Sequence, residues 1–179
     1  MPTSPGPMLK VIACGAAPAA DVGRLVDLAL AADWEVEVVP TPSGLDFIDV
    51  AALEGRTGVA VRTRHTEPDR PTSRQADAFI VAPATFNTVN KLALGISDTY
   101  ALHMLATAVG RGLPVAVLPF VNTALAGRAP FRSSVEQLRA EGVSVLLGPG
   151  GYEPHEPGVG AGHDGFPWAA ALDAVRLGR

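Results

Sequence analysis

The stretch "FIVAPATFNTVNKLALGISDTY", residues 79–100, joins an apolar segment to an amphipathic one. The apolar residues 79–82 predict a buried strand that ends at Pro83, and the apolar spacing that follows is typical of a helix. A buried strand leading into a helix is the repeating unit of a parallel α/β sheet. Three small polar side chains separate the two elements, which is more than a turn requires: Thr85, Asn87 and Thr88.

The same alternation of apolar runs and helical periodicity continues on both sides of this stretch. Other predicted strands cover 9–14, 35–40, 57–63, 113–119 and 143–148. Predicted helices cover 21–32, 44–53, 86–111 with a break near Gly95, 131–142 with Ser133 or Ser134 as N-cap and Gly142 as C-cap, and 167–178. The sequence therefore predicts one doubly wound α/β domain, Rossmann-like or flavodoxin-like, with about six parallel strands. We expect it to span residues 9–179, after a disordered segment of residues 1–8.

Composition and charge exclude several classes of function. The chain of 179 residues carries a formal charge of −4, has 6% aromatic residues and lacks a Lys/Arg cluster, so we expect no nucleic acid partner. No apolar run approaches the ~18 residues that span a membrane, and the N-terminus lacks the features of a secretory signal. We therefore expect a cytoplasmic protein that does not bind membranes. Its single cysteine, Cys14, excludes an internal disulfide, and we expect no metal site.

Small or polar residues follow four of the predicted strands, where parallel α/β sheets bind their ligands. They are Gly15 after the first strand, Thr41 and Ser43 after the second, Thr85, Asn87 and Thr88 after strand 78–83, and Asn122 and Thr123 after strand 113–119. Each has a structural alternative, because a glycine suits a tight turn and a hydroxyl residue suits a helix N-cap. Four such groups at one sheet edge favour a ligand site. Cys14 ends a predicted buried strand, which favours a small core residue over a redox thiol.

Two stretches carry a resemblance to a known family. "PATFNTVNKLALGISD" resembles the signature of the homo-oligomeric flavin-containing cysteine decarboxylases, which reads Pro-Ala-Ser-Ala-Asn-Thr and continues into a helix with Lys-Ile-Ala-x-Gly and a following Asp. The matching residues are Pro83, Ala84, Asn87, Thr88, Lys91, Ala93, Gly95 and Asp98. "PFVNTALAGRAPF" is similar to the family's second signature, Pro-x-Met-Asn-x-x-Met-Trp followed by Asn-Pro-Phe. The resemblance extends from the first strand to the final helix.

The resemblance implies a flavin mononucleotide (FMN) site at the predicted sheet edge. By position, the FMN contacts fall on Gly15, Ala16, Ala17, Ser43, Gly44, Leu45, Thr85, Phe86, Asn87, Thr88 and Phe120. Backbone N–H groups and hydroxyls in these loops suit the phosphate and ribityl chain. The resemblance also implies that Asn122 holds the substrate carboxylate, that the thiol carbon is oxidised by FMN, and that the adjacent carboxylate then leaves as carbon dioxide.

The family's catalytic histidine has no exact counterpart here. Counting back from Pro83, its position holds Asp69, and His65 lies four residues earlier in a loop with two prolines. Either Asp69 acts as the base, or His65 is recruited by an inward fold of the loop, or His65 is a solvated loop histidine. The C-terminal stretch also lacks the cysteine that pantothenate enzymes carry there, and we interpret its His155 and His163 as histidines of a flexible tail.

Three functions remain open from the sequence. The first is an FMN-dependent decarboxylase acting on a cysteine-type thiol carboxylate, either a small molecule or a peptide C-terminus. The second is a flavin-binding or regulatory relative without that activity, and the third is a flavin prenyltransferase. The resemblance implies a site completed by a neighbouring subunit. Since residues 98–109 are apolar on more than one helical face, at Met104, Leu105 and Val109, we expect a homo-oligomer built from trimers.

Overall fold

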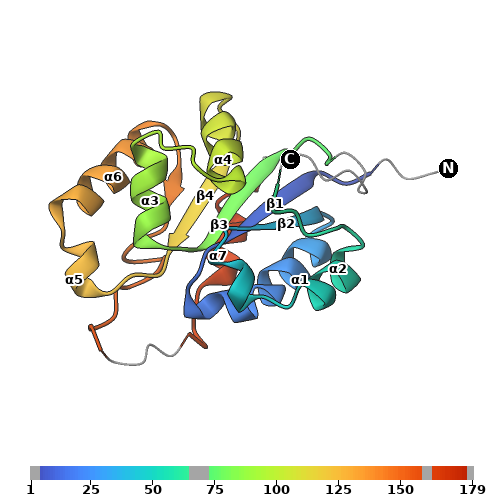
Figure 1. The fold of residues 1–179 in the computed structure, drawn as a ribbon, viewed down its shortest axis with the longest axis horizontal. Helices are drawn as coiled ribbons and strands as arrows, with labels where there is room; N and C mark the ends of the chain where they lie inside the picture. The colour runs from blue at the N-terminus through green and yellow to red at the C-terminus, as the bar shows by residue number, and fades with distance from the viewer. Residues whose placement is uncertain (1–4, 65–72, 159–162, 177–179) are drawn as a thin grey trace.

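A computed structural model describes residues 5–64, 73–158 and 163–176, which form a parallel sheet between two layers of helices (Figure 1). The described strands are β1 (Met8–Ala13), β2 (Glu35–Pro40), β3 (Ala78–Ala84), β4 (Val115–Pro119) and β5 (Ser144–Val145). They pair in the order β2-β1-β3-β4-β5, and all pairs are parallel. This order is the flavodoxin-like form of the doubly wound fold, so the predicted fold class is confirmed.

Helices cover both faces of this sheet. The 3₁₀ helices are η1 (Ala17–Asp21) and η2 (Leu45–Phe47), and the α-helices are α1 (Gly23–Ala31), α2 (Val50–Thr57), α3 (Phe86–Ala93), α4 (Tyr100–Gly110), α5 (Thr123–Ala126), α6 (Ala129–Ala140) and α7 (Trp168–Asp173). In Figure 1, α1, α2 and α7 lie on one side of the strands, while α3, α4 and α6 lie on the other. None of the helices in the described ranges is both long and apolar enough to cross a membrane.

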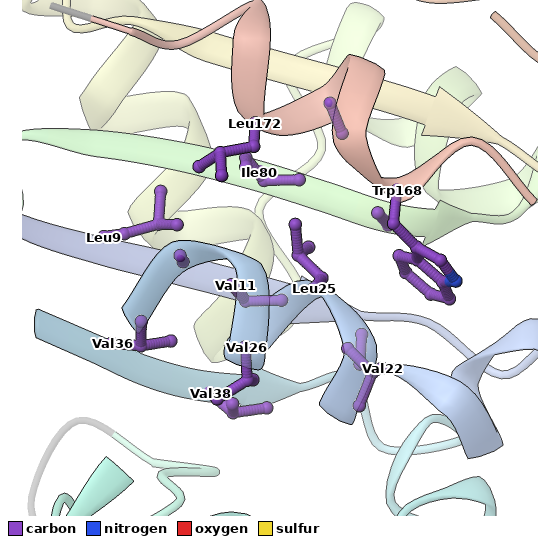
Figure 2. Close-up of a cluster of buried hydrophobic side chains, with 14 of the residues drawn as sticks. Leu9, Val11, Val22, Leu25, Val26, Val36, Val38, Ile80, Trp168 and Leu172 are labelled. Atoms are coloured by element: carbon purple, nitrogen blue, oxygen red, sulfur yellow. The ribbon is translucent and has the colours of Figure 1, made fainter. Parts of the chain in front are cut away.

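The first hydrophobic core lies between the sheet and helices α1 and α7 (Figure 2). Leu25 of α1 and Leu172 of α7 are almost fully buried against Val11 and Ile80 of the central strands. Burying a leucine of this kind contributes roughly 1.5–3 kcal/mol, so this packing orients both helices on the sheet. Because strand side chains alternate between the two faces, β1 presents its other residues to the second core.

The second core fixes helix α3 on the opposite face. Ile12, Val81 and Val117 of the sheet belong to it, together with apolar side chains of α3, α4 and α6. Two polar contacts then tie α3 to α6: the Ser134 hydroxyl donates to Asn90 Oδ1 at 2.8 Å, and Gln137 Nε2 donates to the Ala93 carbonyl at 2.7 Å. These contacts hold the second half of α3 against α6, and the helix begins two residues after β3 ends.

The predicted strand at 57–63 is wrong, because this segment forms no sheet ladder. Its backbone groups bond to side chains: the Val61 N–H donates to the Glu54 carboxylate at 2.9 Å, and Val59 exchanges hydrogen bonds with the Thr57 hydroxyl. The Arg62 N–H donates to the Val38 carbonyl of β2 at 3.2 Å. The buried Arg62 side chain instead lies 3.5 Å from Glu37 of β2, which also pairs with Lys10 of β1 at 3.3 Å.

Several element boundaries also differ from the prediction. Met8 is buried and opens β1, so it belongs to the folded domain rather than to a disordered start. Helix α6 begins at Ala129, with Pro130 in its first turn, and Ser134 lies inside the helix instead of capping it. Pro130 suits a helix start because its missing N–H would have no helical partner there. The predicted break near Gly95 is confirmed, since this glycine adopts φ 69° between α3 and α4.

Candidate functional site

The loops after β1 and β2 touch at the carboxyl edge of the sheet. A Cβ atom added to Gly15 would lie 2.9 Å from Ser43, and one added to Gly44 would lie 2.1 Å from the Ala13 carbonyl oxygen. Both distances are shorter than any normal contact, so the two loops approach as closely as glycine allows. The buried Thr41 hydroxyl accepts a hydrogen bond from the Gly44 N–H at 3.1 Å and closes the second loop.

The end of β1 is joined to the start of α3 by a small polar cluster. Thr85 caps the helix by accepting from the Thr88 N–H, and the two hydroxyls lie 3.0 Å apart. The Cys14 thiol donates to Thr88 Oγ1 at 3.4 Å in a buried position. Burial raises the pKa of the Cys14 thiol above its ordinary value of 9.0, although the Thr88 hydrogen bond acts against this shift. Cys14 is therefore a neutral core residue, as the sequence predicted.

The first turn of α3 offers hydrogen-bond donors at the same edge. The N–H groups of Phe86 and Asn87 have no helical carbonyl within reach, because they begin the helix. Such groups, together with the helix dipole, favour an anion such as a phosphate. The Phe86 ring stacks on Phe131 of α6, with ring centroids 5.4 Å apart and an interplanar angle of 15°. Asn87 is exposed in the isolated chain.

Asn122 lies at the end of β4 with its side chain in a fixed orientation. Its Oδ1 accepts from the Leu125 N–H at 2.9 Å and caps α5. This bond turns the amide nitrogen away from the helix, and within the described part of the chain that nitrogen donates to no partner. Phe120 precedes it, and the Phe120 N–H donates to the Ala84 carbonyl at 2.8 Å, joining the ends of β3 and β4. The arrangement leaves Asn122 as an amide donor at the sheet edge.

The C-terminal loop brings an imidazole to this edge, which sequence reasoning missed. His155 forms an isolated parallel bridge with Asn122, and its carbonyl accepts from the Thr123 N–H at 2.8 Å. Its ring lies over Phe120, and its Nδ1 is 2.8 Å from the Tyr152 hydroxyl. Partial burial raises the pKa of Tyr152, so this hydroxyl stays protonated. The interpretation of His155 as part of a flexible tail is therefore wrong.

The predicted site residues divide into three groups. Gly15, Ser43, Gly44, Thr85, Phe120 and Asn122 lie in the connections after the strands, Thr88 lies in the first turn of α3, and these segments meet at the edge, as the contacts above show. Ala16, Ala17, Leu45, Phe86 and Asn87 lie next to these residues in the sequence, at or beside the starts of η1, η2 and α3. His65 and Asp69 lie outside the described residues. Among the residues described, no three His, Cys, Asp or Glu side chains gather as a metal site would require.

These groups fit FMN chemically. The free N–H groups of α3 suit a phosphate and the Thr85 hydroxyl suits a ribityl chain, while the contacts at Gly15 and Gly44 hold the loops after β1 and β2 together at the same edge. In the flavodoxin-like strand order, the switch point between β1 and β3 is the expected position of such a ligand. The individual FMN contacts stay predictions.

Comparison with known proteins places the chain in a family. A sequence profile described as "Flavoprotein" matches residues 3–164. Over 118 residues the chain is 29% identical to the coenzyme A biosynthesis bifunctional protein CoaBC of Thermococcus kodakarensis. That alignment covers 63% of this chain but only 29% of the longer relative. The family resemblance predicted from the two signatures is confirmed.

Solved structures extend the similarity over nearly the whole chain. The cypemycin decarboxylase CypD is 26% identical with a TM-score of 0.71, and the match covers 95% of this chain and 92% of that one. TvaF, described as an FMN-dependent cysteine decarboxylase from thioviridamide biosynthesis, is also 26% identical. Its TM-score is 0.70, with 94% of this chain and 97% of that one covered. Each match therefore covers nearly the whole of both chains.

Proposed function

The chain belongs to the Flavoprotein family, and we propose that it is an FMN-binding enzyme that oxidatively decarboxylates a cysteine-type thiol carboxylate. The orientation of the Asn122 side chain is the observation that carries the proposal. Its Oδ1 is fixed by the helix cap, so its amide nitrogen presents donors at the edge where FMN would bind. A cysteine C-terminus combines a carboxylate that such donors bind with a thiol that can be oxidised.

The loops of β1, β2 and β3 support the cofactor part of the proposal. Free N–H groups at the start of α3 would hold the FMN phosphate, and the packing at Gly15 and Gly44 brings the loops after β1 and β2 to the same edge. When bound, FMN supplies the two-electron acceptor for the thiol carbon, and dioxygen is the oxidant that would restore it. Neighbours described as FMN-dependent cysteine decarboxylases favour this cofactor and this reaction class.

Asn122 caps α5 through its Oδ1 and offers donors through its amide nitrogen, and a substitution by aspartate changes the second role alone. In Asn122→Asp, a carboxylate oxygen still accepts from the Leu125 N–H, so the cap survives. The amide donors are replaced by a second negative oxygen, which repels the substrate carboxylate. We expect this variant to retain FMN, seen as flavin absorbance that co-purifies with the protein, and to bind a cysteine-terminated peptide at least ~10-fold more weakly, the cost of a lost charged hydrogen bond.

The matched control is Asn87→Asp, which makes the same amide-to-carboxylate change in the first turn of α3. It should weaken FMN rather than the peptide. Isothermal titration with FMN and then with the peptide separates the two effects. If Asn122→Asp binds the peptide as tightly as the wild type does, Asn122 is not the carboxylate anchor.

We also propose that the chain assembles into a homo-oligomer, with trimers as the basic unit. Leu94 is 70% exposed and Ile96 is 41% exposed in the connection between α3 and α4. Met104 and Val109 of α4 are partly exposed, whereas Leu105 is fully buried within the chain and does not contribute to a contact surface. Exposed side chains of this size favour a protein partner. Light scattering that gives the single-chain mass of 18.5 kDa would contradict this assembly.

A further inference from the structure

The loop between β5 and α7 returns to the carboxyl edge of the sheet and places His155 beside Asn122. The two residues form a parallel bridge, and the Thr123 N–H donates to the His155 carbonyl at 2.8 Å. The backbone of His155 is thereby fixed next to the proposed carboxylate anchor. This contact joins His155 to a segment more than thirty residues earlier in the chain. The position of His155 therefore could not be predicted from the local sequence.

The His155 side chain is oriented from two directions. Its ring lies on Phe120, with centroids 4.9 Å apart and an angle of 32°. Its Nδ1 is 2.8 Å from the Tyr152 hydroxyl, and the Tyr152 ring is packed against Phe120 and Phe166. In the tautomer whose Nδ1–H donates to the tyrosine oxygen, Nε2 carries the free lone pair. The described residues give Nε2 no partner, and the ring is only partly buried.

The other histidines within the described ranges are placed differently. His103 belongs to α4 and lies 3.4 Å from the Ser97 hydroxyl. The His163 Nε2 is 3.3 Å from the Asp21 carboxylate of η1. Of the three histidines in the described ranges, His155 is the one that forms a bridge with Asn122.

We propose that His155 is a catalytic residue that accepts the thiol proton of the substrate. This inference rests on the proposed function and assigns to the C-terminal loop the imidazole that residue 69 does not supply. Because the backbone of His155 is bridged to Asn122, we place the thiol of a substrate whose carboxylate is held by Asn122 beside this ring. The sulfur–hydrogen bond breaks, the proton forms a bond with His155 Nε2, and the sulfur keeps the electron pair as a thiolate. No electrons are transferred in this step, and the resulting imidazolium is stabilised by its bond to Tyr152.

The test is a comparison of two equal changes in one loop, His155→Gln and His163→Gln. A glutamine keeps a polar group near Tyr152 or near Asp21 but is not a base at neutral pH. FMN-loaded proteins are mixed without oxygen with a synthetic peptide that ends in cysteine, and the loss of oxidised-flavin absorbance gives the rate. We expect His155→Gln to slow this rate by about 10²–10⁴-fold, the usual effect of losing a general base, and His163→Gln to leave it within about twofold.

Chemical rescue separates a proton acceptor from a packing role. In His155→Ala, added imidazole should restore much of the rate, whereas pyrazole should not, because pyrazole has a similar shape but is a far weaker base. Equal rescue by both compounds, or a wild-type rate in His155→Gln, would overturn the role of His155 while leaving the proposed function intact. A wild-type protein that holds FMN and leaves the peptide unchanged would contradict both.

Discussion

Replacing Gly44 with alanine should destabilise the protein because of one steric contact. The added Cβ would lie 2.1 Å from the Ala13 carbonyl oxygen and 3.0 Å from its carbon. The Gly44 backbone has φ −69° and ψ −28°, which alanine adopts without strain, so the cost comes from the clash and not from the conformation. To relieve the clash, the loop after β2 must move away from β1.

The size of the effect follows from what that movement breaks. Overpacking in a dense region costs about 1–3 kcal/mol, and a contact with backbone belongs at the upper end of that range. The Ala13 carbonyl also accepts from the Thr41 N–H at 2.9 Å, and losing this bond adds about 1 kcal/mol. We therefore expect Gly44→Ala to lower the free energy of unfolding by about 3–4 kcal/mol.

Gly55 provides the matched control, since a Cβ there would meet nothing within 4 Å. It lies in helix α2 and is exposed, so Gly55→Ala should stabilise the protein by about 0.5–1 kcal/mol through helix propensity. The free energy of unfolding of Gly15→Ala should fall between those of the other two variants, because its Cβ would lie 2.9 Å from Ser43, partly against a movable side chain. Urea unfolding followed by tryptophan fluorescence gives all three free energies. If the free energies of unfolding of Gly44→Ala and Gly55→Ala agree within about 1 kcal/mol, the loops after β1 and β2 are not packed as described.

Two further predictions concern the same edge. Asn87→Asp should weaken FMN binding by about 1–3 kcal/mol, because it removes an amide donor and adds a negative charge near the phosphate; unchanged FMN affinity in a fluorescence titration would contradict the placement of FMN. Burial raises the pKa of the Cys14 thiol in the folded protein, so above its ordinary value of 9.0 the unfolded chain ionises first and the free energy of unfolding falls as pH rises. Cys14→Ala should lack this part of the alkaline decline, and urea unfolding of both proteins across that pH range would show no difference if the thiol were exposed.

The fold could be predicted where apolar runs and special backbone positions coincide. β1 and β3 are buried along their whole length and apolar except for Lys10, and Gly95 marks a helix break with positive φ. The segment 57–63 shows the limit of this reasoning, because it has the composition of a strand. Backbone groups of Val59 and Val61 bond to the Thr57 hydroxyl and the Glu54 carboxylate of α2, and such side-chain partners cannot be identified from apolar periodicity.

Only those residues of the candidate site that directly follow a strand could be predicted from the sequence. Gly15, Ser43, Thr85 and Asn122 each follow a strand, so the rule for parallel sheets brings them to one edge. His155 follows no strand of comparable length, and β5 has only two residues, Ser144–Val145. Its position depends on the bridge to Asn122 and on aromatic packing around Phe120, which are contacts between distant segments. A histidine in a glycine-rich sequence gives no sign of either.

The most direct test of the proposed reaction is the mass of a peptide product. The FMN-loaded protein is incubated in air with a synthetic peptide that ends in cysteine, and with the same peptide ending in serine as a control. Oxidative decarboxylation predicts that the cysteine peptide loses one carbon dioxide and two hydrogens, while the serine peptide is unchanged. A cysteine peptide of unaltered mass beside fully bound FMN would contradict the reaction, and a product that lost carbon dioxide alone would contradict the oxidative step.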